Sequence, residues 1–197
     1  MFLGEAPAGD QARAAFDDDR EADGYISNHT RLWCWRPDLR QAFLELRTGV
    51  MSSSALTDRD FAILVTATAS ARGDSYCSLA WGSRLAELSD DETAAQVISG
   101  EPAPALERDA ALADWARSVV RDPNATTPAD VAQLRDLGFG DREIFEATAF
   151  IAFRLALCVV NDALGAAPDK QLADAAPTAV REAIDYGRRP SRTPSAP

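Results

Sequence analysis

One stretch of the sequence decides which fold class this chain can adopt. Residues 61–69, FAILVTATA, are the longest run that suits a β-strand. The run follows LTDRD, in which Thr57 is a natural N-cap and Asp60 stands three residues later, as in a capping box. It also continues unbroken to Gly73, a residue that commonly ends helices. We therefore predict a buried helix over residues 58–72 instead of a strand.

The rest of the chain has the pattern of helices separated by proline, aspartate and glycine. The longest of them, DREIFEATAFIAFRLALCVVNDALG, begins at residue 141 and is apolar on nearly all sides over about 23 residues. Such a helix belongs at the centre of a bundle or in a subunit interface. Strand signals are almost absent elsewhere, so the predicted fold class is all-α.

The two ends of the chain differ in composition from the middle. Residues 1–24 are predicted to form an acidic arm that includes one amphipathic turn. Residues 188–197 are rich in Pro, Ser and Arg, which predicts a disordered tail. A single folded domain is expected between them, over residues 25–187.

Charge excludes one class of partner. The net charge is -11 at pH 7, and a field of that sign repels polyphosphates, so no nucleic acid partner is expected. No apolar run reaches the ~20 residues that span a bilayer, so no membrane segment is expected either. The acidic start MFLGEAPAGD lacks the design of a secretory signal, which favours a cytoplasmic protein.

Cysteine and histidine usage limits the chemistry further. The three cysteines, Cys34, Cys77 and Cys158, form no disulfide framework. With His29 as the only histidine, they offer no spacing typical of a metal site. We therefore expect neither a metal nor another cofactor.

Cys77 is the candidate nucleophile, in the stretch GDSYCSLAWGSRL that begins at Gly73. If Gly73 ends one helix, Asp74 caps the next, and Cys77 occupies its third position. Free backbone N–H groups there favour a thiolate, whereas the charge of Asp74 opposes one. Trp81, one turn later, can pack on the sulfur but cannot accept or deliver a proton at neutral pH. Two interpretations stay open: a reactive thiol, or a cysteine packed in the core.

Several segments, in the right order, resemble the AhpD-like superfamily, which contains the alkylhydroperoxidases and carboxymuconolactone decarboxylases. They look most like its peroxidase-related branch. The similar segments are NHTRLWCWRPDLRQAFLEL, LTDRDFAILVTATASARGDSYCSLAWGSRLA and LGFGDREIFEATAFIAFRLALCVVNDALGA. The resemblance covers about residues 25–187, and it implies that this domain is an AhpD-like helical bundle.

The resemblance also implies roles for particular positions. Family members of the peroxidase type use a Cys-x-x-Cys-x-x-x-His motif with an upstream glutamate, and the second cysteine attacks the hydroperoxide while the first resolves it. The second cysteine matches Cys77. The first falls on Asp74, the histidine on Trp81, and the glutamate on Ala62, with Asp60 half a turn away. The resolving and proton-transferring groups would therefore have to come from outside this motif.

Other residues are weaker candidates for the site. His29 is interpreted as a surface or capping residue, or as a replacement acid or base that reaches Cys77. Cys158 is predicted to be core; Cys34 is also apolar in context, but it is the better candidate for a distant resolving thiol. Arg154 stands in an apolar helix, which predicts a salt bridge with Glu146, Asp162 or Asp74, or else a bound anionic substrate.

Three functions are considered. The resemblance implies an antioxidant oxidoreductase that reduces small hydroperoxides through Cys77, which is then reduced by an external thiol or by Cys34. The second hypothesis is a non-catalytic or repurposed AhpD-like protein that binds a small molecule or senses redox state. The third, a decarboxylase of the carboxymuconolactone type, lacks the acid and histidine it would use. Family members form dimers, trimers or hexamers, so a homo-oligomer is expected.

Overall fold

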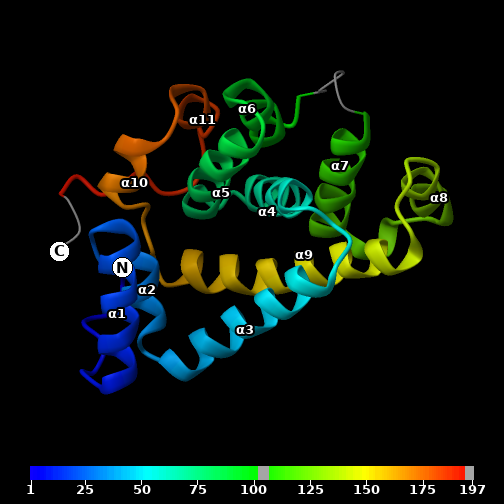
Figure 1. The fold of residues 1–197 in the computed structure, drawn as a ribbon. Coiled ribbons are helices and arrows are strands. Elements are labelled where there is room, and N and C mark those ends of the chain that lie inside the picture. Colours follow the sequence, from blue (N-terminus) through cyan, green and yellow to red (C-terminus); the bar gives the residue numbers. More distant parts are fainter. Residues whose placement is uncertain (102–106, 194–197) are drawn as a thin grey trace.

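A computed structural model describes residues 1–101 and 107–193 of the chain (Figure 1). Within these ranges the chain forms α-helices, one short 3-10 turn at Pro123–Ala125, and no strand. The all-α prediction is therefore confirmed. The helices are α1 (Asp10–Asp23), α2 (Asn28–Trp33), α3 (Pro37–Ser53), α4 (Asp58–Arg72), α5 (Ser75–Leu88), α6 (Asp91–Ser99), α7 (Glu107–Arg121), α8 (Pro128–Asp136), α9 (Asp141–Ala163), α10 (Lys170–Ala175) and α11 (Thr178–Glu182).

Helix α4 lies at the centre of the fold, because residues 60–69 are all buried. It packs against α5, α7 and α9, and its Phe61 meets Phe150 of α9 edge to face, with ring centroids 4.7 Å apart. Figure 1 shows α9 crossing the middle of the molecule, with α4, α5 and α7 on one side and α3 on the other. The segment that resembled a strand is thus the most buried helix of the molecule.

Local capping signals explain where the central helices begin and end. Thr57 and Asp60 form the predicted capping box at the start of α4. Gly73 ends α4 in the left-handed conformation, with φ of 78°, which glycine adopts without the steric cost of a Cβ atom. The predicted bounds of α4 and α9 are both confirmed.

The N-terminal arm contains a full helix, longer than the single turn expected from the sequence. Ala12 and Ala15 of α1 are buried and share a cluster with Cys34. Asp19 accepts hydrogen bonds from the backbone and hydroxyl of Ser27 and from the hydroxyl of Thr30. Helix α1 is therefore attached to α2 by polar contacts at the start of α2 and by apolar contacts with Cys34 at its end.

The first part of the predicted tail contacts the domain. The Ser75 hydroxyl accepts a hydrogen bond from the Arg188 backbone N–H at 2.9 Å and donates one to the Arg188 carbonyl at 2.7 Å. The backbone N–H of Ser191 donates to the Pro168 carbonyl. These bonds hold residues 188–191 against the start of α5 and the segment after α9. Residues 194–197 of the predicted tail lie outside the described residues.

Helix α3 is the least buried long helix, since none of its 17 residues is fully buried. It runs along the side of α9 that faces away from α4 (Figure 1), and it covers the cavity described below. Among the helices of the described ranges, none has the length and apolar content needed to cross a bilayer.

Candidate active site

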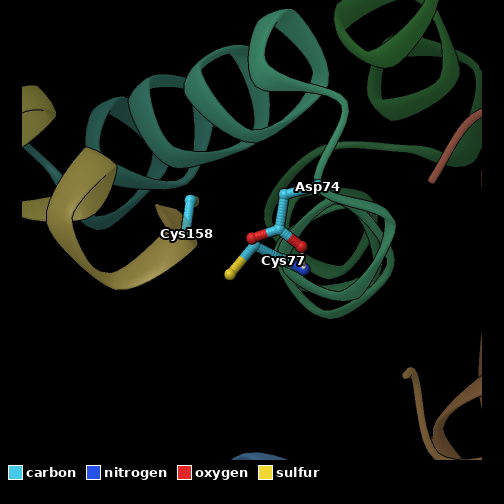
Figure 2. Close-up of side chains that lie close together, drawn as sticks. All are labelled: Asp74, Cys77 and Cys158. Carbon is cyan, nitrogen blue, oxygen red and sulfur yellow. Dashed lines mark hydrogen bonds between the residues drawn. The ribbon is translucent and has the colours of Figure 1, made fainter. Parts of the chain in front are cut away.

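The turn between α4 and α5 places Cys77 at the start of a helix. Asp74 is the N-cap of α5, and its Oδ1 accepts a hydrogen bond from the Cys77 backbone N–H at 2.9 Å. Cys77 is therefore the third residue of the helix, as predicted, where the positive helix end favours a thiolate. Figure 2 shows Asp74 and Cys77 projecting from the start of α5 toward Cys158 on α9.

Two side chains of α9 donate hydrogen bonds to the Cys77 sulfur. Arg154 Nη2 lies 3.6 Å from Cys77 Sγ, and Asn161 Nδ2 lies 3.8 Å from the same atom. Trp33 fixes the orientation of Asn161, because its indole Nε1 donates to Asn161 Oδ1 at 2.9 Å. A cation and a fixed amide donor both stabilise the negative charge of a thiolate.

The environment of Arg154 differs from the one expected. Its side chain is 8% exposed, yet within the described part of the chain it forms no ion pair with Glu146, Asp162 or Asp74. Its guanidinium instead lies 5.4 Å from the centroid of the Trp81 ring and contacts Cys77. The predicted salt bridge is therefore wrong: Glu146 pairs with Arg142 and Ser54, and Arg154 turns toward the thiol.

Cys158 lies beside Cys77, a neighbourhood that its sequence context did not reveal. It is fully buried, as predicted, and shares an apolar cluster with Ala69 and Cys77. Hydrogen bonding to Cys77 and burial raise the pKa of Cys158 above its usual range, and Asp74 raises it further. Cys34, expected to be the better partner thiol, lies in the separate cluster with α1.

Asp74, Cys77 and Cys158 also bring possible metal ligands together. One carboxylate oxygen and the two sulfurs all lie within 4.8 Å of one another, although the sequence spacing had predicted no such group. A thiolate and carboxylate set of this kind suits Zn²⁺. The Arg154 guanidinium opposes a second cation there, because it already contacts Cys77 Sγ.

A cavity of about 360 Å³ opens beside Cys77, between α2 and α3 on one side and α5 and α9 on the other. Its wall contains several large apolar side chains, namely Trp33, Phe43, Trp81, Phe153 and Leu157. Its polar lining includes Cys77, His29, Arg40, Arg47 and Arg154. A volume of this size accommodates a small organic molecule.

His29, a sequence candidate, lines this cavity. Its backbone N–H donates to the Tyr76 hydroxyl at 3.4 Å, and its ring centroid lies 6.0 Å from that of Trp33. Burial lowers the pKa of His29 to about 4, and the nearby charges of Arg154 and Arg40 lower it further. The imidazole is therefore neutral at pH 7 and lacks the second ring proton that an imidazolium would donate.

Asp60, the remaining sequence candidate, is not brought to Cys77. Its carboxylate accepts hydrogen bonds from the backbone and hydroxyl of Thr57 and from both terminal nitrogens of Arg108. It lies at the start of α4, whereas Cys77 packs near Ala69 at the other end. The structure therefore groups Cys77, Asp74, Trp81 and His29 around one site and leaves Asp60 outside it.

Three residues of the site had no candidate role in the sequence. Cys158 and Asn161 come from the long apolar helix, and their positions beside Cys77 depend on how α9 packs against α5. Arg47 comes from α3 and lines the cavity with its Nε unpartnered among the described residues. The one signal available was the i, i+4 and i+7 spacing of Arg154, Cys158 and Asn161, which places them on one face of a helix.

Comparison with solved structures identifies the architecture. No protein-family model matches the chain, and no curated protein sequence matches it significantly. An uncharacterized peroxidase-related protein with an alkylhydroperoxidase AhpD core, from Ralstonia eutropha JMP134, superposes with a TM-score of 0.76 at 24% identity, over 97% of this chain and 96% of that one. The chain adopts the AhpD-like fold.

Three further structures, of two proteins, share this AhpD-like fold. An uncharacterized peroxidase-related protein from Silicibacter sp. TM1040 matches with a TM-score of 0.76 at 22% identity, over 87% of this chain and 91% of that one. The debrominase Bmp8 matches with a TM-score of 0.73 at 15% identity, over 94% of this chain and 99% of that one. A Cys-to-Ala variant of Bmp8 in complex with 2,3,4-tribromopyrrole matches with a TM-score of 0.68 at 16% identity, over 94% of this chain and 97% of that one.

Proposed function

We propose that this protein is a thiol-dependent oxidoreductase in which Cys77 attacks a small substrate bound in the cavity between α3 and α9. One observation carries the proposal: Cys77 lines that cavity while Arg154 and Asn161 both donate to its sulfur. A thiol that only fills a core has no need of such donors. They are suited to holding a thiolate, which is the reactive form of cysteine.

The first candidate substrate is a small hydroperoxide. The Cys77 thiolate attacks the terminal oxygen, the O–O bond breaks, and Cys77 becomes a sulfenic acid while the alkoxide leaves. The alkoxide takes its proton from water in the cavity, because His29 is neutral at pH 7. An external thiol reductant then returns Cys77 to its starting state.

The second candidate reaction is reductive dehalogenation of a small aromatic molecule. It is favoured by the apolar wall of Trp33, Phe43, Trp81 and Phe153 and by the likeness to the debrominase Bmp8. In this reaction the Cys77 thiolate takes the halogen, and the aromatic carbanion takes a proton from water. A second thiol then displaces halide from the sulfenyl halide to form a disulfide, which an external thiol reduces.

An anionic group on the substrate fits Arg47 and Arg154, two of the three arginines that line the cavity; the third, Arg40, lies 3.7 Å from the carboxylate of Asp19. Burial lowers the pKa of Arg47, and the nearby charge of Arg154 lowers it further; neither guanidinium forms an ion pair within the described residues. An acidic group between them would remove this repulsion. We expect a hydroperoxide that carries a carboxylate to react faster than a neutral one of similar size, and Arg47→Gln to abolish that preference.

Thiol titration tests the proposal. The purified protein is treated with one equivalent of cumene hydroperoxide or of 2,3,4-tribromopyrrole, and free thiols are counted before and after. We expect loss of thiol from the wild type and none from Cys77→Ser, with Cys34→Ser behaving as the wild type. A Cys77 that stays reduced with both reagents at neutral pH contradicts the proposal.

We also propose that the protein acts as a homo-oligomer in the cytoplasm, where free thiols persist. In support, α3 has no fully buried residue, and several large apolar side chains of α3 and α9 are exposed, namely Leu39, Leu46, Phe145 and Val159. Light scattering coupled to size exclusion gives the mass in solution. A monomer at micromolar concentration would contradict this part of the proposal.

A further inference from the structure

The proposed function leaves one thiol of the site without a role. Cys158 Sγ lies within 4.8 Å of Cys77 Sγ, and the two cysteines form one buried cluster with Ala69. A disulfide requires the sulfurs to approach to about 2.05 Å. The remaining gap is small enough for side-chain rotation to close while α5 and α9 stay packed against α4.

The two thiols differ in their access to the cavity. Cys77 is among the residues that line it, whereas Cys158 is not and has an exposed fraction of 0%. A substrate in the cavity therefore meets Cys77 first, and Cys158 is protected from direct oxidation behind it. This asymmetry distinguishes an attacking thiol from one that reacts only with its oxidised neighbour.

The charged groups near the two sulfurs also distinguish Cys77 as the attacking thiol from Cys158. Arg154 and Asn161 donate to Cys77 Sγ, which favours its thiolate. Cys158 lies beside the carboxylate of Asp74 and stays protonated. Asp74 Oδ2 is buried and has no hydrogen-bond partner among the described residues, so it is free to accept the Cys158 proton when that thiol reacts.

From this geometry we propose that Cys158 resolves oxidised Cys77 by forming a disulfide between α5 and α9, with Asp74 as the proton acceptor. The proposal rests on the proposed function, because it begins with an oxidised Cys77. Cys158 attacks the sulfur of the Cys77 sulfenic acid, an S–S bond forms, and the S–O bond breaks. The Cys158 proton passes through Asp74 to the departing hydroxide, which leaves as water, and an external dithiol later reduces the disulfide.

Cys34 does not fill this role in the structure. It is buried in the cluster formed with Ala12 and Ala15 of α1, apart from Cys77 and Cys158. Burial raises its pKa, so it is also a poor nucleophile at neutral pH. It therefore serves as the matched control, since Cys34→Ser removes a buried thiol without touching the site.

The test compares products in the wild type, Cys158→Ala, Cys158→Ser and Cys34→Ser after one equivalent of cumene hydroperoxide. We expect the wild type and Cys34→Ser to lose two hydrogens and to yield linked peptides that contain Cys77 and Cys158. Both Cys158 variants should gain one oxygen at Cys77, which dimedone captures. Their turnover with a dithiol reductant should fall about tenfold or more. Thermal melts establish that each variant is folded.

The outcomes separate this proposal from the proposed function. If the wild type forms the dimedone adduct as readily as Cys158→Ala and yields no linked peptides, Cys158 is not the resolving thiol. If the hydroperoxide oxidises no thiol in any variant, the proposed function fails instead. Diamide, which oxidises thiols without peroxide chemistry, then decides on the pair: linkage of Cys77 to Cys158 supports it, and the absence of linkage overturns it.

Discussion

The two ends of α4 each hold a buried carboxylate, and the two carboxylates differ in how completely they are paired. Asp60 at the start accepts hydrogen bonds from Thr57 and from both terminal nitrogens of Arg108. Asp74, just beyond the other end, uses only Oδ1, while Oδ2 is buried without a partner among the described residues. An unpaired buried oxygen destabilises a fold, so its presence beside two thiols favours a chemical role over a structural one.

The same contrast extends to the arginines near each acid. Arg108 is half-exposed and paired with Asp60, whereas Arg154 is buried and contacts a sulfur and an indole ring. Structural polar groups are usually buried with their partners. Groups that bind a substrate are often incompletely paired in its absence. Of the two ends of α4, only the end near Asp74 and Arg154 has such groups.

The largest effect on stability is expected at the start of α4, where Asp60 is fully paired. Asp60→Asn removes the charge that Arg108 and the capping box require, so it should lower the free energy of unfolding by about 2–3 kcal/mol. Urea denaturation measures this change. Thiol reactivity of Cys77 should stay as in the wild type, and a loss of reactivity without unfolding would show that the two ends are coupled.

His29 should make stability depend on pH. Its pKa of about 4 in the folded state lies below the ordinary value of 6.5, so the unfolded chain binds the proton more tightly between these values. Stability should therefore fall by about 2 kcal/mol from pH 7 to pH 5 through this residue. Asp162, whose pKa burial raises to about 6, acts in the opposite direction over the same range.

The difference between wild type and His29→Asn isolates the histidine, because the contribution of Asp162 is common to both proteins. Denaturant melts at pH 7 and pH 5 provide the four values needed. Equal pH dependence in the two proteins would mean that His29 titrates normally and is not buried in the cavity wall.

Arg154→Met tests the cation that contacts the Cys77 sulfur near the second end of α4. Removing the cation should slow alkylation of Cys77 by iodoacetamide about tenfold at pH 7, because the thiolate loses its charged donor. Stability should not fall, since the buried guanidinium has no carboxylate partner to leave behind. Arg47→Met is the control, as Arg47 lines the cavity without a hydrogen bond to the sulfur; an equal effect on both rates would contradict a direct role for Arg154.

A small effect on stability is also expected for Asp74→Asn. Asparagine caps helices as well as aspartate does, and Oδ2 has no partner to lose, so the change should stay within about 0.5 kcal/mol. A loss as large as that of Asp60→Asn would mean that Asp74 is paired after all, and the contrast between the two ends of α4 would disappear.

Local signals in the sequence predicted the central helices, but not the whole site. The bounds of α4, its capping box and the capping of α5 by Asp74 all follow from residues within four positions of one another. The capping box also explains why Asp60 cannot serve Cys77, because it already engages that carboxylate. The neighbours Cys158, Asn161 and Arg154 lie about 80 positions away along the chain. Their contact with Cys77 depends on how α9 packs across α4 and α5, which no local pattern specifies.

The left-handed Gly187 and the hydrogen bonds between Arg188 and Ser75 lie over the turn that holds Asp74. A Cβ atom at Gly187 would come within 2.7 Å of the Gly73 carbonyl oxygen, so the chain passes there in close contact. The turn that presents Asp74 is therefore held in part by a residue 113 positions later in the sequence than Ser75.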